Sequence, residues 1–191
     1  YFLMGIIDEK VKNPELDVRE MFLSDLENHN RDEYGFFEEN FFRTRKHLKE
    51  TDYKDWIFLS HPYPIVADIR MLLKNHQESI YFITTRDRES VVHLLKAYEV
   101  EFVEDQVFSK EDLGHKKSKK DLIKEIIRKN DVSESLFVDD LKSNLVACEN
   151  MENLILLQAC WGYVPPEERK DNKGQILRGL KNFIQEDNVG A

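Results

Sequence analysis

The clearest indication of the fold is SLFVDDLKSN, residues 135–144. Here an apolar run ends in two adjacent carboxylates, Asp139 and Asp140, and Asn144 follows one helical turn later. A short apolar run bounded by polar residues is typical of a strand that helices cover on both faces. We therefore expect a buried strand that presents Asp139 and Asp140 at its carboxyl end.

Short apolar runs and helical patterns alternate on both sides of this stretch. The segments are SIYFIT (79–84), SVVHLLKAY (90–98), DLIKEIIRK (121–129), NLVACEN (144–150) and NLILLQACW (153–161). Such alternation is typical of βαβ units and a parallel sheet. The sequence therefore predicts an α/β fold with a Rossmann-like doubly wound parallel sheet.

The chain opens on YFLMGIID, residues 1–8, a further apolar run that ends in a carboxylate, Asp8. In a doubly wound sheet the first strand is usually central, and ligands bind outside the carboxyl ends of the strands. We expect residues 1–8 to form this first strand and Asp8 to lie at the ligand site.

Residues 13–60 follow a different pattern. Apolar residues recur every three or four positions in DVREMFLSDLENHN (17–30) and FFEENFFRTRKHLKE (36–50), which predicts helices. The only strand-like run in this part is WIFLS (56–60), and the two prolines of HPYP (61–64) then break the chain. This part therefore has the character of a helical insert.

These patterns divide the chain into a core and an insert. A chain of 191 residues is long enough for one domain with a full hydrophobic core and a small additional module. We expect an α/β core built from residues 1–12 and 61–191, and a small helical cap, residues 13–60, inserted after the first strand.

The composition narrows the class of partner. A net charge of -9 and a pI near 5.2 disfavour binding to nucleic-acid polymers and to anionic membranes. The apolar opening is too short to span a bilayer and lacks the marks of a targeting segment. Cys148 and Cys160 lie in apolar surroundings that are typical of reduced core thiols. We expect a cytoplasmic protein with a small-molecule substrate.

The adjacent carboxylates Asp139 and Asp140 favour a cation. Two like charges at the end of a buried strand repel each other unless a cation or donor neutralises them. Mg²⁺ takes such oxygen ligands, above all where a phosphate completes its coordination. The alternative is a solvated turn or the first turn of a helix, where carboxylates are also favourable.

Two further groups indicate a phosphate. In YFITTRD (81–87), Thr84 and Thr85 end a strand and Arg86 follows, so hydroxyl and backbone donors meet at a helix start. The alternative is that Thr85 or Asp87 only caps the following helix.

In GHKKSKKDLIKEI (114–126), four lysines surround the beginning of a helix, where the helix dipole disfavours cations. A phosphate would give these lysines a counter-charge, whereas a solvated face is the usual role of a lysine cluster.

In order and spacing, YFITTRD, KKSKKDLIKEI and LFVDDLKSN resemble motifs II, III and IV of the haloacid dehalogenase (HAD) superfamily of phosphohydrolases. The resemblance covers residues 60–168, and the helical insert stands where this family places its cap. The opening together with YFITTR is similar to 5′(3′)-deoxyribonucleotidases within the superfamily.

The resemblance implies a mechanism in which an aspartate of the first strand forms an aspartyl-phosphate that water then hydrolyses. It implies Asp8 as acid and base, Thr84 as a ligand of the phosphoryl group, and Lys119 as the neutralising cation. Lys117 is the alternative to Lys119.

The same resemblance implies further ligands of the substrate and the metal. Thr85, Arg86 and Lys117 would assist Thr84 in binding the substrate. Asp140, with Asp139 and Asp8, would bind Mg²⁺.

The opening strand departs from the motif of this family, which is Asp-x-Asp. If Asp8 is the second aspartate, Ile6 occupies the nucleophile's position. If Asp8 is the nucleophile, Lys10 replaces the acid and base. A single aspartate between Ile6 and Ile7 would instead give an ordinary motif.

The sequence thus predicts a Mg²⁺-dependent phosphatase that hydrolyses a small phosphomonoester, for which a nucleotide is one candidate. The alternative is a catalytically inactive protein of the same fold that binds a phosphorylated ligand or a protein partner.

Overall fold

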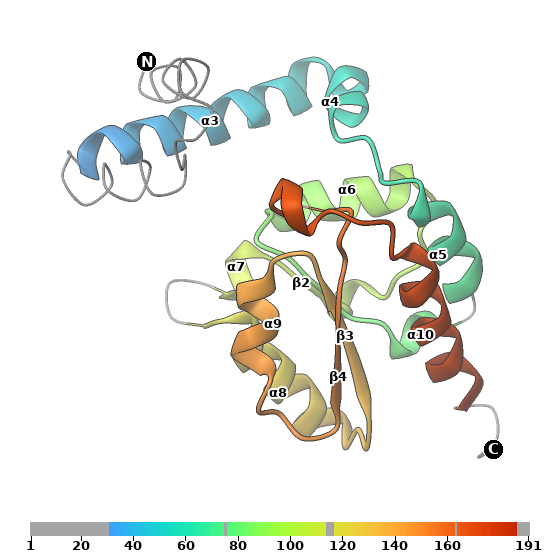
Figure 1. Cartoon of the computed structure of the whole chain (residues 1–191). Coiled ribbons are helices and arrows are strands. Elements are labelled where there is room, and N and C mark those ends of the chain that lie inside the picture. The colour runs from blue at the N-terminus through green and yellow to red at the C-terminus, as the bar shows by residue number, and fades with distance from the viewer. Residues whose placement is uncertain (1–30, 75, 114–116, 163, 187–191) are drawn as a thin grey trace. The chain divides into compact units, whose positions relative to one another are not determined.

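The computed structural model describes residues 31–74, 76–113, 117–162 and 164–186 (Figure 1). The predicted first strand, with Asp8, lies outside these described residues. The chain divides into two compact units, Tyr1–Leu59 and Ser60–Ala191, and each is described by itself. The division lies beside the boundary that the sequence predicts between insert and core.

The described part of the first unit is helical. It comprises α3 (Arg31–Thr51) and α4 (Tyr53–Leu59). All but the last residue of the strand-like run at residues 56–60 belong to α4, which agrees with the helical insert expected for residues 13–60. Asp52 explains the helix: its side chain accepts a hydrogen bond from the Asp55 N–H at 3.1 Å, and its carbonyl accepts one from Trp56 at 3.0 Å. A capping aspartate therefore starts a helix where the apolar run alone favours a strand.

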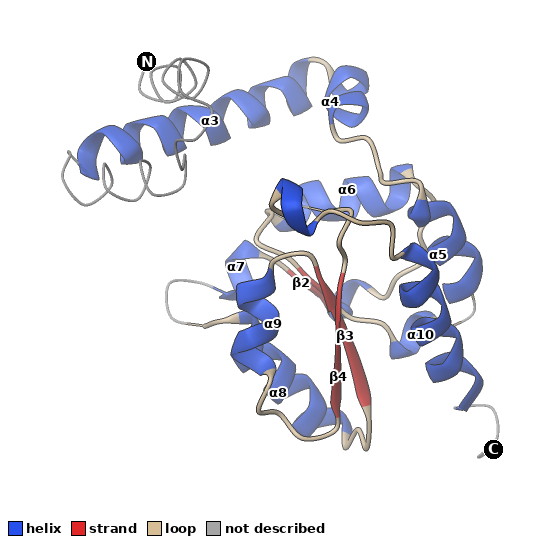
Figure 2. Cartoon of the chain, viewed as in Figure 1, coloured by secondary structure: helices blue, strands red, loops and turns tan. Residues whose placement is uncertain are grey.

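The second unit is α/β, with short parallel strands among helices (Figure 2). The strands are β1 (Phe82–Ile83), β2 (Val107–Phe108), β3 (Ser135–Asp139) and β4 (Leu154–Gln158). The α-helices are α5 (Ile65–Leu73), α6 (Arg88–Ala97), α7 (Lys110–Leu113), α8 (Lys119–Asn130), α9 (Lys142–Cys148) and α10 (Lys173–Glu186). Among the described residues of this unit, 3-10 turns lie at Gln77–Ser79, Glu104–Gln106 and Pro166–Glu168.

The strands form two parallel pairs. β1 pairs with β2, and β3 pairs with β4 in a register that places Ser135 opposite Leu154 and Asp139 opposite Gln158. Within the described ranges each pair is a separate two-stranded sheet. The mixed α/β character is therefore observed, whereas the doubly wound sheet that would unite the pairs stays a prediction.

Helices cover the β3–β4 pair. α9 contacts both strands and α10 contacts β3, and Figure 1 shows α8 and α9 on one side of the pair and α10 on the other. Leu122 of α8, Cys148 of α9 and Ile176 of α10 are each at most 2% exposed. Cys148 and Cys160 are buried free thiols, which confirms the expectation of two core cysteines.

A helix that crosses a bilayer needs about 20 predominantly apolar residues. None of the helices in the described ranges has both the length and the apolar character that crossing a bilayer requires.

The packing of α10 predicts a stability difference. Ile176 is 1% exposed, so Ile176→Ala leaves a cavity and should lower the free energy of unfolding by about 2–5 kcal/mol. Ile155 of β4 is 43% exposed, and Ile155→Ala is the control with a much smaller expected loss. Urea unfolding followed by circular dichroism measures both. Equal losses would show that α10 does not pack as described.

Candidate functional site

The candidate site is built around Asp139, the last residue of β3. This aspartate is 7% exposed. Its Oδ2 accepts a hydrogen bond from Lys119 Nζ at 2.6 Å, and its Oδ1 accepts from the Leu141 N–H at 2.8 Å and from Asn144 Nδ2 at 3.1 Å. Three donors thus fix the carboxylate, and one of them is a cation whose own side chain is only 17% exposed. Charge-assisted bonds of this kind are among the strongest in proteins.

The start of α8 explains how Lys119 reaches this place. Ser118 is the N-cap, and a capping box joins it to Asp121, whose N–H donates to the Ser118 hydroxyl. Hydrogen bonds from the Ser118 hydroxyl and N–H to the carboxylate lower the pKa of Asp121. Lys119 is therefore the first helical residue, where the helix dipole disfavours its charge. The carboxylate of Asp139 offsets that cost.

The two candidate lysines have different partners. Lys119 contacts Asp139, whereas Lys117 is exposed and forms an ion pair with Glu125 of α8 at 3.0 Å. The structure thus brings Lys119, the preferred lysine of the sequence analysis, to the end of β3.

Asp140 lies next to Asp139 and against the chain that follows β4. A Cβ atom built on Gly162 would lie 2.4 Å from both Cβ and Oδ2 of Asp140, so the side chain of Asp140 fills the space that a glycine leaves. The Asp140 carbonyl accepts a hydrogen bond from Gln158 Nε2 at 3.3 Å, and the same nitrogen donates to Glu168 at 3.2 Å. The Asp140 carbonyl is thus held by the last residue of β4, and the Asp140 side chain lies against the segment after β4.

The threonine group lies at the end of β1. The Thr84 N–H donates to the Phe108 carbonyl at 2.9 Å, and Thr84 Oγ1 accepts from the Arg86 N–H at 3.1 Å. Asp87 accepts from the Ser90 N–H at 2.8 Å and is the N-cap of α6, as the capping alternative expected. Because Thr84 Oγ1 acts here as an acceptor, its own proton can be donated to an anion.

An ionic network that the sequence analysis missed joins the carboxyl ends of β1 and β2. Asp112 Oδ2 accepts from the N–H and the hydroxyl of Ser109, each at 2.8 Å, and from Arg88 Nη2 at 3.1 Å. Burial alone would raise the pKa of Asp112, but the two Ser109 donors and the Arg88 guanidinium together lower it. No motif marks these residues, although the spacing Ser-x-x-Asp is a known local capping pattern.

The metal-binding prediction rests on two described carboxylates. Asp139 and Asp140 are adjacent at the end of β3, and Asp8, the predicted third ligand, lies outside the described residues. In the part of the chain that the structure describes, no three His, Cys, Asp or Glu side chains gather in a way that could hold a metal ion.

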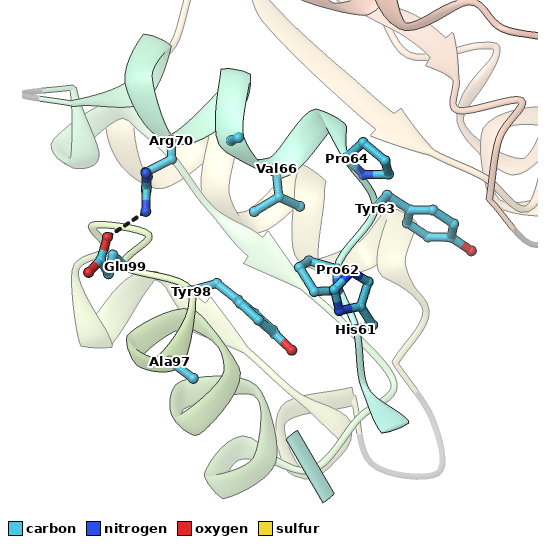
Figure 3. A pocket seen from close by; sticks show the side chains of 10 residues that line it. His61, Pro62, Tyr63, Pro64, Val66, Arg70, Ala97, Tyr98 and Glu99 are labelled. Carbon is cyan, nitrogen blue, oxygen red and sulfur yellow. Dashed lines mark hydrogen bonds and ion pairs between the residues drawn. The ribbon is translucent and has the colours of Figure 1, made fainter. Parts of the chain in front are cut away.

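A separate hollow of about 460 Å³ lies between the start of α5 and the end of α6 (Figure 3). None of the predicted site residues lines it. Its polar groups include Arg70, which forms an ion pair with Glu99 at 2.5 Å, and Tyr98, whose hydroxyl donates to the Ser60 carbonyl at 3.2 Å. The candidate chemistry therefore lies at the strand ends and not in this hollow.

Comparison with known proteins adds no assignment: no family model, no curated protein and no solved structure matches the chain.

The buried pair predicts unequal effects of two lysine substitutions. Lys119→Met leaves the Asp139 carboxylate without its cation and should lower the free energy of unfolding by about 3–5 kcal/mol. Lys117→Met removes an exposed pair and should cost less than about 1 kcal/mol. Chemical denaturation of the two variants measures the difference. Equal effects would show that Asp139 does not depend on Lys119.

The Asp112 network predicts a pH dependence. A carboxyl whose folded pKa is below its usual value near 3.8 contributes stability above that value, and this contribution is lost as the pH falls through the folded pKa. Asp112→Asn should therefore lower the free energy of unfolding at neutral pH by about 1–3 kcal/mol and have a smaller effect at acid pH. Denaturation between pH 3 and pH 7, roughly the range of carboxyl titration, measures this, with the exposed Asp105→Asn as control. An effect of Asp112→Asn that does not vary with pH would contradict the account.

Proposed function

We propose that this chain is a Mg²⁺-dependent phosphatase of the haloacid dehalogenase type that hydrolyses a small phosphomonoester. One observation carries the proposal: Lys119 is held 2.6 Å from the buried Asp139, beside Asp140, at the carboxyl end of a parallel strand. Ligands of open α/β sheets bind at this end of the strands. A cation and two carboxylates at that place suit a metal ion and a phosphoryl group.

Asp139 and Asp140 fit Mg²⁺ as donors. Mg²⁺ is usually bound through one or two carboxylates, with water and substrate phosphate completing its coordination. The side chain of Asp140 lies in the space beside Gly162, and that of Asp139 is fixed by three donors. Asp140 would be the principal ligand, helped by Asp139 and by Asp8. When bound, Mg²⁺ would neutralise charge on the phosphoryl oxygens.

The chain's own residues would bind and orient the phosphoryl group. The Thr84 hydroxyl would donate its proton to a phosphoryl oxygen, with Thr85 and Arg86 assisting at the same turn. Lys119 would neutralise negative charge from the start of α8, and Lys117 would bind the substrate further out. Preorganised donors of this kind stabilise the charge that develops in phosphoryl transfer.

The first strand would supply the covalent step. Asp8 would act as acid and base if a further aspartate stood between Ile6 and Ile7, and would otherwise itself attack phosphorus. In either case the attacking carboxylate oxygen forms a bond to phosphorus while the bond to the leaving alcohol breaks, and water then hydrolyses the acyl phosphate. We also propose a cytoplasmic location, because two buried free thiols suit a reducing compartment.

One observation favours a second function. Ile6 stands where the resemblance places the nucleophile, and its side chain cannot attack phosphorus. The same groups would then bind a phosphorylated ligand without hydrolysing it, or the fold would serve a protein partner.

Hydrolysis of an aryl phosphate tests the proposed activity. With Mg²⁺ the protein should turn over the substrate, and a chelator should stop the reaction. Asp140→Asn should lower kcat/KM on the order of 100-fold or more, because it removes charge stabilisation of the transition state. Asp131→Asn, an exposed change at the end of α8, is the matched control and should leave kcat/KM unchanged.

The intact mass of the protein must agree with its sequence in this assay. Absence of turnover, together with Mg²⁺-dependent binding of phosphate, would favour the binding protein. Turnover that neither the chelator nor Asp140→Asn affects would contradict the proposal.

A further inference from the structure

The backbone of Gly162 lies so close to the side chain of Asp140 that no side chain would fit at position 162. A Cβ atom on Gly162 would lie 2.4 Å from Asp140 Cβ, 2.4 Å from its Oδ2 and 2.8 Å from its Cγ. Carbon atoms that are not bonded normally stay about 3.5–4.0 Å apart. Rotation of the Asp140 side chain moves Cγ and Oδ2 but leaves Cβ in place. A side chain at 162 therefore requires the backbone itself to shift.

Hydrogen bonds hold the backbone around Gly162. The Gly162 N–H donates to the Ala159 carbonyl at 3.1 Å, and the Gly162 carbonyl accepts from Val164 at 3.0 Å. On the other side of the contact, the Ala159 N–H donates to the Asp139 carbonyl at 2.9 Å and extends the pairing of β3 and β4 by one residue. The chain at Gly162 is thus tied to the strand end that carries Asp140.

Asn172, just before α10, fixes the same segment from its far end. Its Nδ2 donates to the Gln158 carbonyl at 2.7 Å, and its Oδ1 accepts from the Cys160 N–H at 3.1 Å. This side chain spans the exit of β4 and limits how far the following residues can withdraw. A clash at position 162 is therefore relieved most easily by displacement of Asp140.

We propose that Gly162 is a positioning residue for the carboxylate of Asp140. The missing side chain at 162 determines where that carboxylate lies, and any larger residue displaces it and weakens Mg²⁺ binding. The part that concerns Mg²⁺ rests on the proposed function, in which Asp140 is the principal metal ligand. The steric part does not, because it concerns only two residues of the fold.

Two other glycines provide matched controls. A Cβ on Gly174 would have no atom within 4 Å. A Cβ on Gly179 would lie 2.8 Å from Leu157 Cδ1, the far end of a flexible side chain of β4. Gly174→Ala controls for the change of residue type, and Gly179→Ala controls for crowding against a strand away from Asp140.

A double-mutant cycle on thermal unfolding tests the steric part. Gly162→Ala should lower Tm by about 4–8 °C, which is typical of overpacking in a chain of this size. In the Asp140→Gly background, Gly162→Ala should cost little. The Tm of the double variant should therefore lie close to that of Asp140→Gly alone. Asp140→Ala should recover less of the loss than Asp140→Gly, because it retains the Cβ atom. Additive effects without recovery, or equal recovery by both replacements, would overturn the proposal.

Calorimetric titration of the full chain with Mg²⁺ tests the metal part. Gly162→Ala should weaken Mg²⁺ binding about 10-fold or more, as loss of a supporting group does at other metal sites. Gly179→Ala should leave it unchanged, and Asp140→Asn serves as the reference for a lost ligand. Wild-type affinity in Gly162→Ala, with Asp140→Asn impaired, would overturn the inference while the proposed function stands.

Failure of this inference can therefore be distinguished from failure of the proposed function. Equal Mg²⁺ binding by the wild type and Asp140→Asn would instead contradict the proposed function, and the thermal cycle would still decide the steric part. If Gly162→Ala does not fold, recovery of the fold by Asp140→Gly supports the proposal, and absence of recovery overturns it.

Discussion

The ion pair between Lys119 and Asp139 is the interaction on which the candidate site depends. A carboxylate that is 7% exposed is costly unless donors and a counter-charge replace its water. Here the carboxylate ends a strand and the lysine begins the helix that precedes that strand, so one contact of 2.6 Å fixes both elements. The pair also places a cation beside a second carboxylate, Asp140. The stability of the fold and the proposed chemistry therefore both require the pair of Lys119 and Asp139.

Polar side chains that follow the strands hold the strand ends in place. Asn172 binds the chain at the end of β4, Gln158 donates to the Asp140 carbonyl, and Gly162 lets the segment after β4 approach Asp140 closely. At the other strand pair, Arg88 and Asp112 link the helix after β1 to the helix after β2. Both sets of contacts join residues that are more than ten positions apart in the sequence. They supply the rigid support that a site of preorganised donors requires.

The sequence predicted the elements whose pattern is local. The apolar run before Asp139 and the capping aspartate at 87 are visible in single segments, and both occur as expected. β2 escaped prediction because two residues, Val107 and Phe108, are too short to show a period. The apolar run at residues 56–60 is helical, as the predicted helical insert implies, because Asp52 caps the helix Tyr53–Leu59. The contact of Gly162 with Asp140 depends on tertiary packing, which no spacing encodes. Asp8 and the first strand stay predictions.

The proposed function requires that Lys119, Asp139 and Asp140 form a site for a phosphate and Mg²⁺ together. The most direct measurement is the affinity of the wild-type chain for inorganic phosphate, by calorimetry, with Mg²⁺ and again with a chelator. Phosphate should bind in the presence of Mg²⁺, and the chelator should weaken this binding about 10-fold or more, since the metal offsets the charge of both ligand and carboxylates. Phosphate binding that is absent in both conditions, or equal in both, would contradict the proposed function.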